Sequence, residues 1–137
     1  MNLELEELYL NPAIYIGKSE THRWGVFAAE DIKANDVLQE SPYCTFNKKE
    51  LKKSNIITRY TYATGGEHGV DEYVLGFGFA AMYNHNEEYV NAAYQLDTVN
   101  EVMRHYAIED INAGDEIFLD YGCGPEWGED DYWSLGL

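Results

Sequence analysis

The sequence predicts a single domain that is mostly β, with little helix. Its 137 residues are typical of one domain and are enough to bury one hydrophobic core. Short apolar runs recur along the chain, each bounded by turn-forming or charged residues, and this pattern is typical of strands. The sequence contains no internal repeat and no linker long enough to divide it. Many short strands with a single helix signal favour a mostly β domain.

The first part of the chain predicts four short strands, at residues 13–16, 25–28, 37–40 and 43–46. The last two are separated by Ser41-Pro42, a turn-forming pair. Residues 1–10 fit a short helix or an extended arm equally well, and Pro12 ends that segment. At 47–53 an asparagine is followed three residues later by a glutamate, which is typical of a helix start, so one short helix is expected there.

The second half predicts a loop followed by further strands. Residues 64–69 are rich in glycine and predict a surface loop. The apolar run 73–80 also contains glycines, which in a strand usually mark the close approach of another backbone or a ligand. Residues 91–97 and 102–108 flank a polar turn and predict a hairpin, and 115–120 predicts a last strand.

The net charge is strongly negative. Nine Lys and Arg residues stand against 25 Asp and Glu residues, which gives a formal net charge of −16. Such a field repels nucleic acids and anionic membranes and attracts cationic partners, so direct binding to nucleic acid or to a membrane is not expected. Two interpretations stay open, because the charge could simply keep the protein soluble or could recruit a substrate rich in Lys and Arg.

Further features of the sequence indicate a soluble intracellular protein. Residues 1–4 are acidic and lack the features of a leader, and no apolar stretch approaches the roughly 20 residues of a membrane helix. Cys44 and Cys123 are the only cysteines and are expected to be reduced thiols. With two cysteines and four scattered histidines, no metal site is expected.

Three separated segments resemble a known family. The first is Arg-Trp-Gly-Val-Phe-Ala at 23–28. The second runs from Gly-Phe-Gly at 76–78 into Tyr-Asn-His-Asn at 83–86 and Asn-Ala at 91–92, and the third joins Ile-Asn-Ala-Gly-Asp-Glu-Ile at 111–117 to Asp-Tyr-Gly at 120–122. Each motif is common alone, but their order and spacing resemble the SET-domain family of protein-lysine methyltransferases over about residues 13–134. The chain looks most similar to the short viral-type SET proteins, which also end in a run like Asp-Asp-Tyr-Trp at 130–133.

The resemblance implies a fold and a division of the chain. A single SET domain would consist of several short-stranded sheets, little helix and a C-terminal pseudoknot that brings Asn84-His85 next to Tyr121. Residues 1–12 would form an N-terminal arm, 13–122 the SET core and 123–137 an aromatic C-terminal lid. The tail has no Cys-x-Cys motif, so the zinc-binding segment found after the domain in many relatives is not expected.

The implied activity is the transfer of methyl groups from S-adenosylmethionine to a lysine of a basic protein, which leaves S-adenosylhomocysteine. A free lysine has a pKa of about 10.4, so the site must favour the neutral amine. A narrow, dry channel beside the positive sulfonium would do so, and alignment of the reacting atoms would supply much of the remaining rate enhancement. The resemblance implies that the phenol of Tyr121, at the channel floor, orients the amine.

The resemblance also assigns the residues that would bind the cofactor. Trp24 and Gly25 would line its methionine end, where a backbone without bulk lets a ligand approach. Asn84 and His85 would hold its adenine and amino groups. Trp133, or Trp127 in its place, would stack on the adenine as a lid, and Asn91 would brace the loop that carries Asn84.

The lysine channel is expected to be aromatic, because such walls suit an alkyl stem with a cationic head. Tyr60, Leu119 and Tyr132 would line it together with Tyr121, although Tyr60 could equally be a core residue. The substrate would lie as an extra strand along a sheet edge near Phe77.

The chain departs from the family pattern at several positions. Arg23 stands where the family usually has glycine, Asn86 replaces Ser or Cys, Tyr89-Val90 replaces the region of a proline, and 123–129 looks like an insertion. Leu119 stands two residues before Tyr121, where relatives carry Tyr or Phe. A hydroxyl there retains a water that restricts multiple methylation, so Leu119 predicts a di- or trimethylated product.

Two other functions compete with methylation of a histone tail. The chain could be a non-catalytic SET-like module that holds a basic partner, or it could methylate a ribosomal or other non-histone lysine. A histone substrate would place it in the nucleus, or in a host nucleus. The target lysine, the source and the oligomeric state stay open, and a homodimer is compatible with the sequence.

Overall fold

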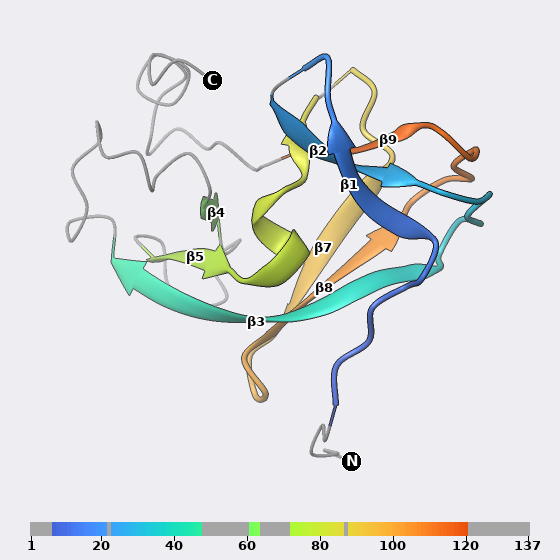
Figure 1. Cartoon of the computed structure of the whole chain (residues 1–137). Coiled ribbons are helices and arrows are strands. Elements are labelled where there is room, and N and C mark those ends of the chain that lie inside the picture. Colours follow the sequence, from blue (N-terminus) through green and yellow to red (C-terminus); the bar gives the residue numbers. More distant parts are fainter. Residues whose placement is uncertain (1–6, 22, 48–60, 64–71, 87, 121–137) are drawn as a thin grey trace.

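The computed structural model describes residues 7–21, 23–47, 61–63, 72–86 and 88–120, of which about half lie in strands and very few in helix (Figure 1). This confirms the mostly β fold. In chain order the elements are β1 Ile14–Lys18, β2 Trp24–Ala28, β3 Val37–Asn47, β4 Thr61–Ala63, β5 Glu72–Gly76, the short 3-10 helix η3 Gly78–Ala81, β6 Asn84–His85, β7 Ala92–Asp97, β8 Val102–Ala107 and β9 Glu116–Leu119.

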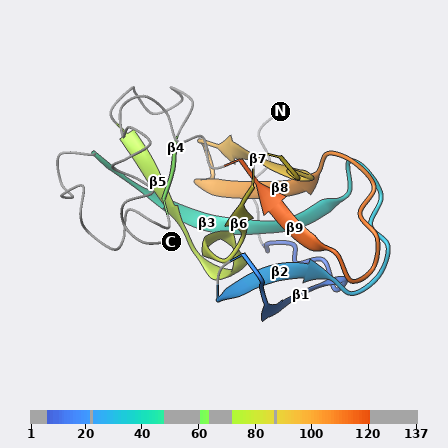
Figure 2. The same ribbon diagram turned by 90° about the horizontal axis from the view of Figure 1, so that it is seen from above.

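The strands form two sheets that combine distant parts of the chain. The smaller sheet has the order β1-β2-β9-β6 and the larger sheet has the order β4-β5-β3-β8-β7. In the smaller sheet β9 is antiparallel to β2 on one side and parallel to the short β6 on the other. Figures 1 and 2 show η3 between the two sheets. Strand β9 therefore joins the N-terminal hairpin to the middle of the chain.

One strand is longer than the sequence predicts. Residues 37–40 and 43–46 were expected to form two strands separated by Ser41-Pro42, but β3 runs through both as a single strand of 11 residues. Pro42 is tolerated because it lies where β3 changes partners, from β8 for the first part to β5 for the second. Its carbonyl oxygen accepts a hydrogen bond from the Phe77 backbone N–H at 3.0 Å. The expected break is therefore wrong.

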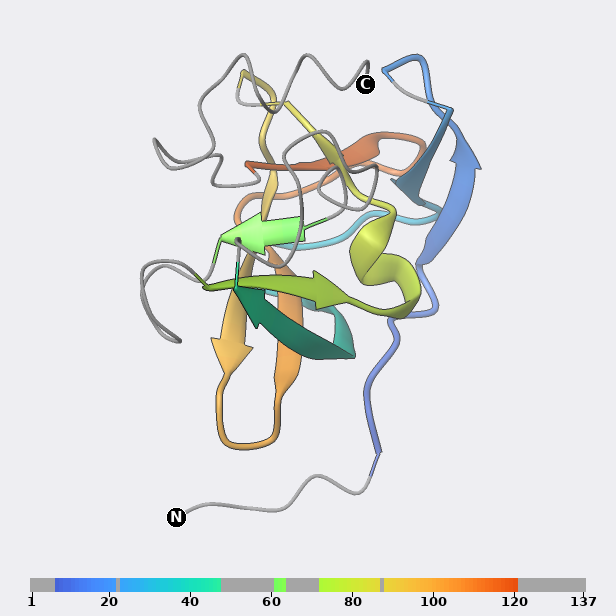
Figure 3. The same cartoon turned by 90° about the vertical axis from the view of Figure 1, so that its left-hand side faces the viewer.

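The predicted hairpin is confirmed as β7 and β8, whose turn lies at the end of the molecule away from β1 and β2 (Figure 3). The apolar run 73–80 is divided: β5 ends at Gly76, and η3 begins at Gly78, which has a φ of +62°. A Cβ at Gly76 would lie 2.7 Å from both Ala80 Cβ and Met103 Sδ. The groups that approach Gly76 closely are therefore side chains of the protein's own core.

The described part of the N-terminal segment is an extended arm. Leu10 forms a β-bridge with Gln39, and the arm continues this pairing through hydrogen bonds between the backbones of Asn11 and Leu38 at 2.9 Å and of Tyr9 and Glu40 at 2.7 Å. Of the two open alternatives, residues 7–11 adopt the arm. Asn47 is the last residue of β3, and the rest of the expected helix at 47–53 lies outside the described residues.

The hydrophobic core lies between the two sheets, so each sheet contributes one apolar face. Each fully buried aliphatic side chain stabilises the fold by about 1.5–3 kcal/mol relative to an exposed one. Strand β9 shows the alternation clearly, because Ile117 and Leu119 are fully buried while Glu116 and Phe118 are only partly buried. The largest other apolar side chains in this core are Ile14, Val26, Ile32, Leu38, Tyr43, Val74, Tyr83, Met103 and Ile111.

A row of polar side chains also lies inside the core. The Tyr83 hydroxyl donates to Gln39 Oε1 at 2.8 Å, and Gln39 Nε2 donates to the Ser41 hydroxyl. His105 lies opposite Gln39 in the β3–β8 pair and stacks on Tyr83 with ring centroids 4.6 Å apart. Burial raises the pKa of Tyr83 and lowers the pKa of His105 to about 3. Both side chains are therefore neutral at physiological pH.

Candidate functional site

Strand β9 brings two of the three sequence motifs together. Its Ile117 pairs with Val26 of β2, directly after Trp24-Gly25, and its Phe118 pairs with Asn84 of β6. The Asn84 side chain then reaches the first motif, because its Nδ2 atom lies 3.0 Å from the Trp24 carbonyl oxygen. Tyr121 of the third motif follows β9 and lies outside the described residues.

Asn84 is the centre of a compact polar cluster. Its side chain is buried, and its Nδ2 atom also lies 3.1 Å from Ser19 Oγ and 2.7 Å from Glu116 Oε2. The Ser19 hydroxyl in turn lies 2.7 and 2.9 Å from the two carboxylate oxygens of Glu116. Three chain segments thus surround one carboxamide. That amide has only two N–H groups for three nearby acceptors, so both of its N–H groups donate hydrogen bonds within the cluster.

Gly25 is a glycine because this cluster packs against its Cα. A Cβ at Gly25 would lie 2.2 Å from Glu116 Oε2 and 2.8 Å from Asn84 Nδ2, distances at which atoms must move apart. The sequence suggested that a ligand uses the space left by the missing side chain. In the structure the protein's own carboxylate and carboxamide fill that space, so the glycine places these two groups beside the β2 backbone.

The other predicted cofactor residues that are described lie at the rim of this cluster. The Trp24 side chain is 48% exposed, and it is the Trp24 carbonyl that contacts Asn84. His85 is partly buried, and its Nδ1 atom lies 3.9 Å from Asp120 Oδ1. The predicted lid residues Trp133 and Trp127 lie outside the described residues.

Asn91 forms hydrogen bonds with the backbone of strand β9, in the way that a neighbouring strand would. Its Nδ2 atom donates to the Glu116 carbonyl at 3.0 Å, and its Oδ1 atom accepts from the Phe118 backbone N–H at 2.8 Å. Its backbone N–H donates to the Phe118 carbonyl at 3.2 Å. The predicted bracing residue therefore fixes the strand against which Asn84 pairs.

The predicted lysine-channel residues are only partly described. Phe77 is 47% exposed and precedes η3 directly, and its backbone N–H donates to the Pro42 carbonyl of β3 at 3.0 Å. Leu119 is fully buried and belongs to the core, while its carbonyl oxygen accepts from the Asn86 N–H at 3.1 Å. Tyr60, Tyr121 and Tyr132 lie outside the described residues, so the channel stays a prediction.

Two residues that hold Asn84, Ser19 and Glu116, were not predicted from the sequence. Ser19 lies before the first motif, and Glu116 belongs to the third motif but was given no role. One signal was present for Glu116: it is a charged residue that opens the apolar strand Ile117-Phe118-Leu119. No comparable signal marks Ser19, because its contact with Glu116 joins residues 97 positions apart.

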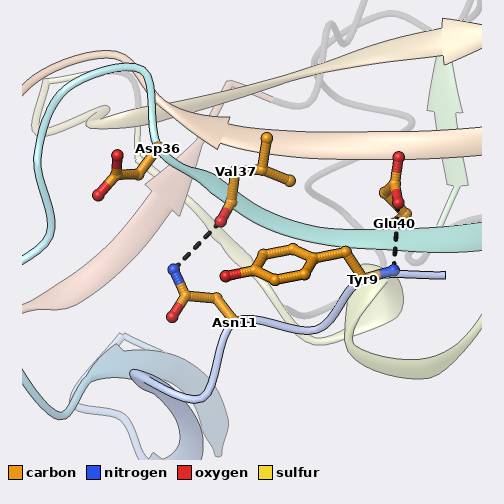
Figure 4. Close-up of a pocket in the computed structure, with 5 residues that line it drawn as sticks. All are labelled: Tyr9, Asn11, Asp36, Val37 and Glu40. Atoms are coloured by element: carbon orange, nitrogen blue, oxygen red, sulfur yellow. Dashed lines mark hydrogen bonds between the residues drawn. The ribbon is translucent and has the colours of Figure 1, made fainter.

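A separate hollow of about 420 Å³ lies between the N-terminal arm and β3 (Figure 4). Two of its polar side chains already have partners: Asn11 Nδ2 donates to the Val37 carbonyl, and Glu40 accepts from the Tyr9 N–H and from Arg104. None of the predicted site residues lines it. The hollow therefore lies where the N-terminal arm packs against β3. It is lined by Tyr9, Asn11, Asp36, Val37 and Glu40.

Within the described ranges, no three His, Cys, Asp or Glu side chains gather as a metal-binding group. Over those same residues, no helix is long and apolar enough to cross a membrane. The predicted absence of a metal stays a prediction, because part of the chain lies outside these ranges.

The chain is similar to histone-lysine methyltransferases of fungi and plants. The chain is 30% identical over 111 residues to a histone-lysine N-methyltransferase of Schizosaccharomyces pombe that is specific for lysine 37 of histone H3, and the match covers 78% of this chain and 71% of that protein. It is 26% identical over 134 residues to the histone-lysine N-methyltransferase MEDEA of Arabidopsis thaliana, covering 94% of this chain but only 19% of that protein.

Solved structures resemble the fold. A Plasmodium falciparum protein described as a candidate histone methyltransferase superposes with a TM-score of 0.65 and 29% identity, covering 85% of this chain and 99% of that one. The Polycomb Repressive Complex 2 of Chaetomium thermophilum, bound to S-adenosylmethionine, matches with a TM-score of 0.61 and 25% identity, over 80% of this chain and 15% of that one. Residues 23–122 match the family described as the SET domain, so the chain belongs to the SET-domain family.

Proposed function

We propose that this chain is an S-adenosylmethionine-dependent protein-lysine methyltransferase that acts on a histone tail. The observation that carries the proposal is the meeting of Trp24-Gly25 with Asn84 across β9, because these motifs are far apart in the sequence. The names of the relatives, which are histone-lysine methyltransferases, support the reaction and the substrate class. A histone substrate places the activity in a nucleus.

The residues around Asn84 fit the methionine end of the cofactor. That end carries an ammonium and a carboxylate, and the cluster offers a carboxylate, a carboxamide and a backbone carbonyl within a few ångströms of each other. Trp24, Gly25, Asn84 and His85 would hold the cofactor, with Trp133 over its adenine. When bound, S-adenosylmethionine supplies an activated methyl group. The N-terminal arm 1–12, core 13–122 and lid 123–137 remain the proposed division.

The protein's own residues would prepare the acceptor. Tyr121, two residues after Leu119, would form one hydrogen bond with the lysine amine. This bond would direct the lone pair of the amine toward the methyl donor. Tyr60, Phe77 and Tyr132 would exclude water from the lysine stem, which lowers the pKa of the ammonium. The net charge of −16 would attract a Lys- and Arg-rich tail to the surface before it enters the channel.

Tyr121→Phe is expected to lower turnover on histone H3 at least about 100-fold, the usual scale for losing one positioned acid-base or orienting group. The dissociation constant for S-adenosylmethionine, measured by calorimetry, should stay within about threefold. Tyr15→Phe removes a hydroxyl from a 42% exposed tyrosine and is the matched control, with unchanged turnover. Cofactor binding without methylation of any histone or peptide-array target by the wild type would favour a non-catalytic module.

The product state tests the role proposed for Leu119. Its side chain has no hydroxyl to retain a restricting water, so a long reaction with excess cofactor should accumulate di- or trimethyllysine. Mass spectrometry of the best substrate peptide measures this directly. Accumulation of the monomethyl product alone, after the peptide has been fully consumed, would rule out this interpretation while leaving the methyltransferase activity intact.

A further inference from the structure

We infer that Glu116 is a positioning residue for the cofactor: it fixes the Asn84 carboxamide so that Asn84 Oδ1 faces outward to accept a hydrogen bond from the ammonium of the methionine end. This inference rests on the proposed function, since it assumes that the cofactor binds beside Trp24-Gly25. It adds to that function the positioning role of Glu116, which sets the orientation of the Asn84 side chain.

The orientation of Asn84 follows from hydrogen-bonding chemistry. The Trp24 carbonyl oxygen can only accept a hydrogen bond, and so can an ionised Glu116 carboxylate. Both lie within 3.0 Å of the same Asn84 side-chain nitrogen, at 3.0 and 2.7 Å. The alternative orientation would turn the amide oxygen toward two other oxygens. The NH₂ group therefore has to face Glu116, and the amide oxygen has to face the other way.

The outward oxygen is left as an acceptor. Among the residues that the structure describes, every hydrogen bond of the Asn84 side chain uses Nδ2. Although Asn84 as a whole is 6% exposed, its Oδ1 atom is not among the buried unsatisfied atoms of the described residues. An acceptor with this orientation is suited to an N–H donor, and an ammonium is the strongest such donor on the proposed cofactor.

Glu116 also contributes charge. Within the described part of the chain, no Lys, Arg or His nitrogen lies within ion-pair distance of its carboxylate, whereas Glu40 pairs with Arg104 at 2.6 Å. A partly buried carboxylate without a cation is costly to maintain. Ser19 and Asn84 reduce that cost through hydrogen bonds, and a cationic ligand beside them would supply the missing counter-charge.

A cycle of two ligands and two proteins tests this inference. The ligands are S-adenosylhomocysteine and its analogue that lacks the amino group but keeps the carboxylate, and calorimetry gives each dissociation constant. Wild type is expected to bind the amino ligand at least tenfold more tightly. In Glu116→Gln that preference should fall to threefold or less, because the carboxamide at position 116 can donate and no longer fixes Asn84. If Glu116 has only a structural role, Glu116→Gln should weaken the binding of both ligands equally. That result would overturn the inference.

Two further variants complete the design. Asp115→Asn removes the same charge from the neighbouring exposed residue and should keep the wild-type preference. If Glu116→Gln does not fold, Ser19→Ala decides, since it removes one bond to Glu116 and should lower the preference for the amino ligand at least threefold. An unchanged preference in Ser19→Ala would then overturn the inference. Failure of the wild type to bind either ligand would instead contradict the proposed function.

Discussion

Gly25→Ala is expected to weaken S-adenosylmethionine binding at least tenfold while the domain still folds. The new methyl carbon would lie 2.2 Å from Glu116 Oε2 and 3.0 Å from Glu116 Cδ, so the carboxylate has to move. Overpacking of this kind costs about 1–3 kcal/mol. Glu116 is the end of a flexible side chain, so the strain can be relieved by moving it, but only by breaking its bonds to Ser19 and Asn84. The cofactor-binding arrangement is then lost before the fold is.

Gly17→Ala is the matched control for this prediction. Gly17 lies directly opposite Gly25 in the β1–β2 pair, so both variants add one methyl group to the same ladder position. The three atoms nearest to a Cβ at Gly17 would be ring carbons of Tyr15 and Phe27, at 3.1 to 3.4 Å. Calorimetry should show wild-type cofactor affinity for Gly17→Ala. Equal affinity for wild type, Gly17→Ala and Gly25→Ala would mean that the cluster does not shape the cofactor site.

The parts of the fold that the sequence predicts correctly are those decided by local signals. Residues 91–108 form the expected hairpin because two alternating runs flank a polar turn, and all the information lies within those residues. The continuity of β3 through Pro42 could not be predicted in this way. A proline is tolerated there only because β8 and β5 meet β3 on either side of it, and those strands come from later in the chain.

The candidate site likewise contains residues that the sequence predicts and residues whose contacts only the fold determines. The Trp24-Gly25 and Asn84-His85 segments were predicted from motif resemblance, which summarises long-range contacts that no local rule provides. Glu116 was visible as a charged residue at the start of an apolar strand, but its neighbours depend on the β2–β9 register, in which it lies opposite Phe27. Local sequence can therefore mark a residue as unusual, whereas the register decides what that residue contacts.

His105 shows the same limit inside the core. Nothing near it in the sequence distinguishes a fully buried histidine from an exposed one, because strand β8 alternates only loosely. Its burial results from neighbours in two other segments: the ring stacks on Tyr83 at 4.6 Å and lies 5.9 Å from the ring of Tyr94. The physical consequence is a group that is held neutral, since burial lowers the pKa of His105 to about 3.

Acid is therefore expected to destabilise the domain well above the pH at which carboxylates protonate. The unfolded chain binds a proton at His105 with the ordinary pKa of 6.5, whereas the folded chain does so only near a pKa of about 3. The contribution of neutral His105 to stability is complete above about pH 6.5 and is lost as the pH falls toward 3. At pH 5.0 this linkage lowers the free energy of unfolding by about 2 kcal/mol relative to pH 8.

Urea unfolding of wild type and His105→Phe between pH 8 and pH 5 tests this expectation. Phenylalanine keeps a flat ring between the two tyrosines but has no titratable nitrogen, so most of the loss of stability at pH 5 should disappear in the variant. Asp97 does not interfere, because the hydrogen bond from the Asn100 side chain lowers the pKa of its carboxyl group and keeps it ionised in this range. Equal loss of stability in both proteins would mean that other groups carry the acid sensitivity and that His105 accepts its proton inside the fold.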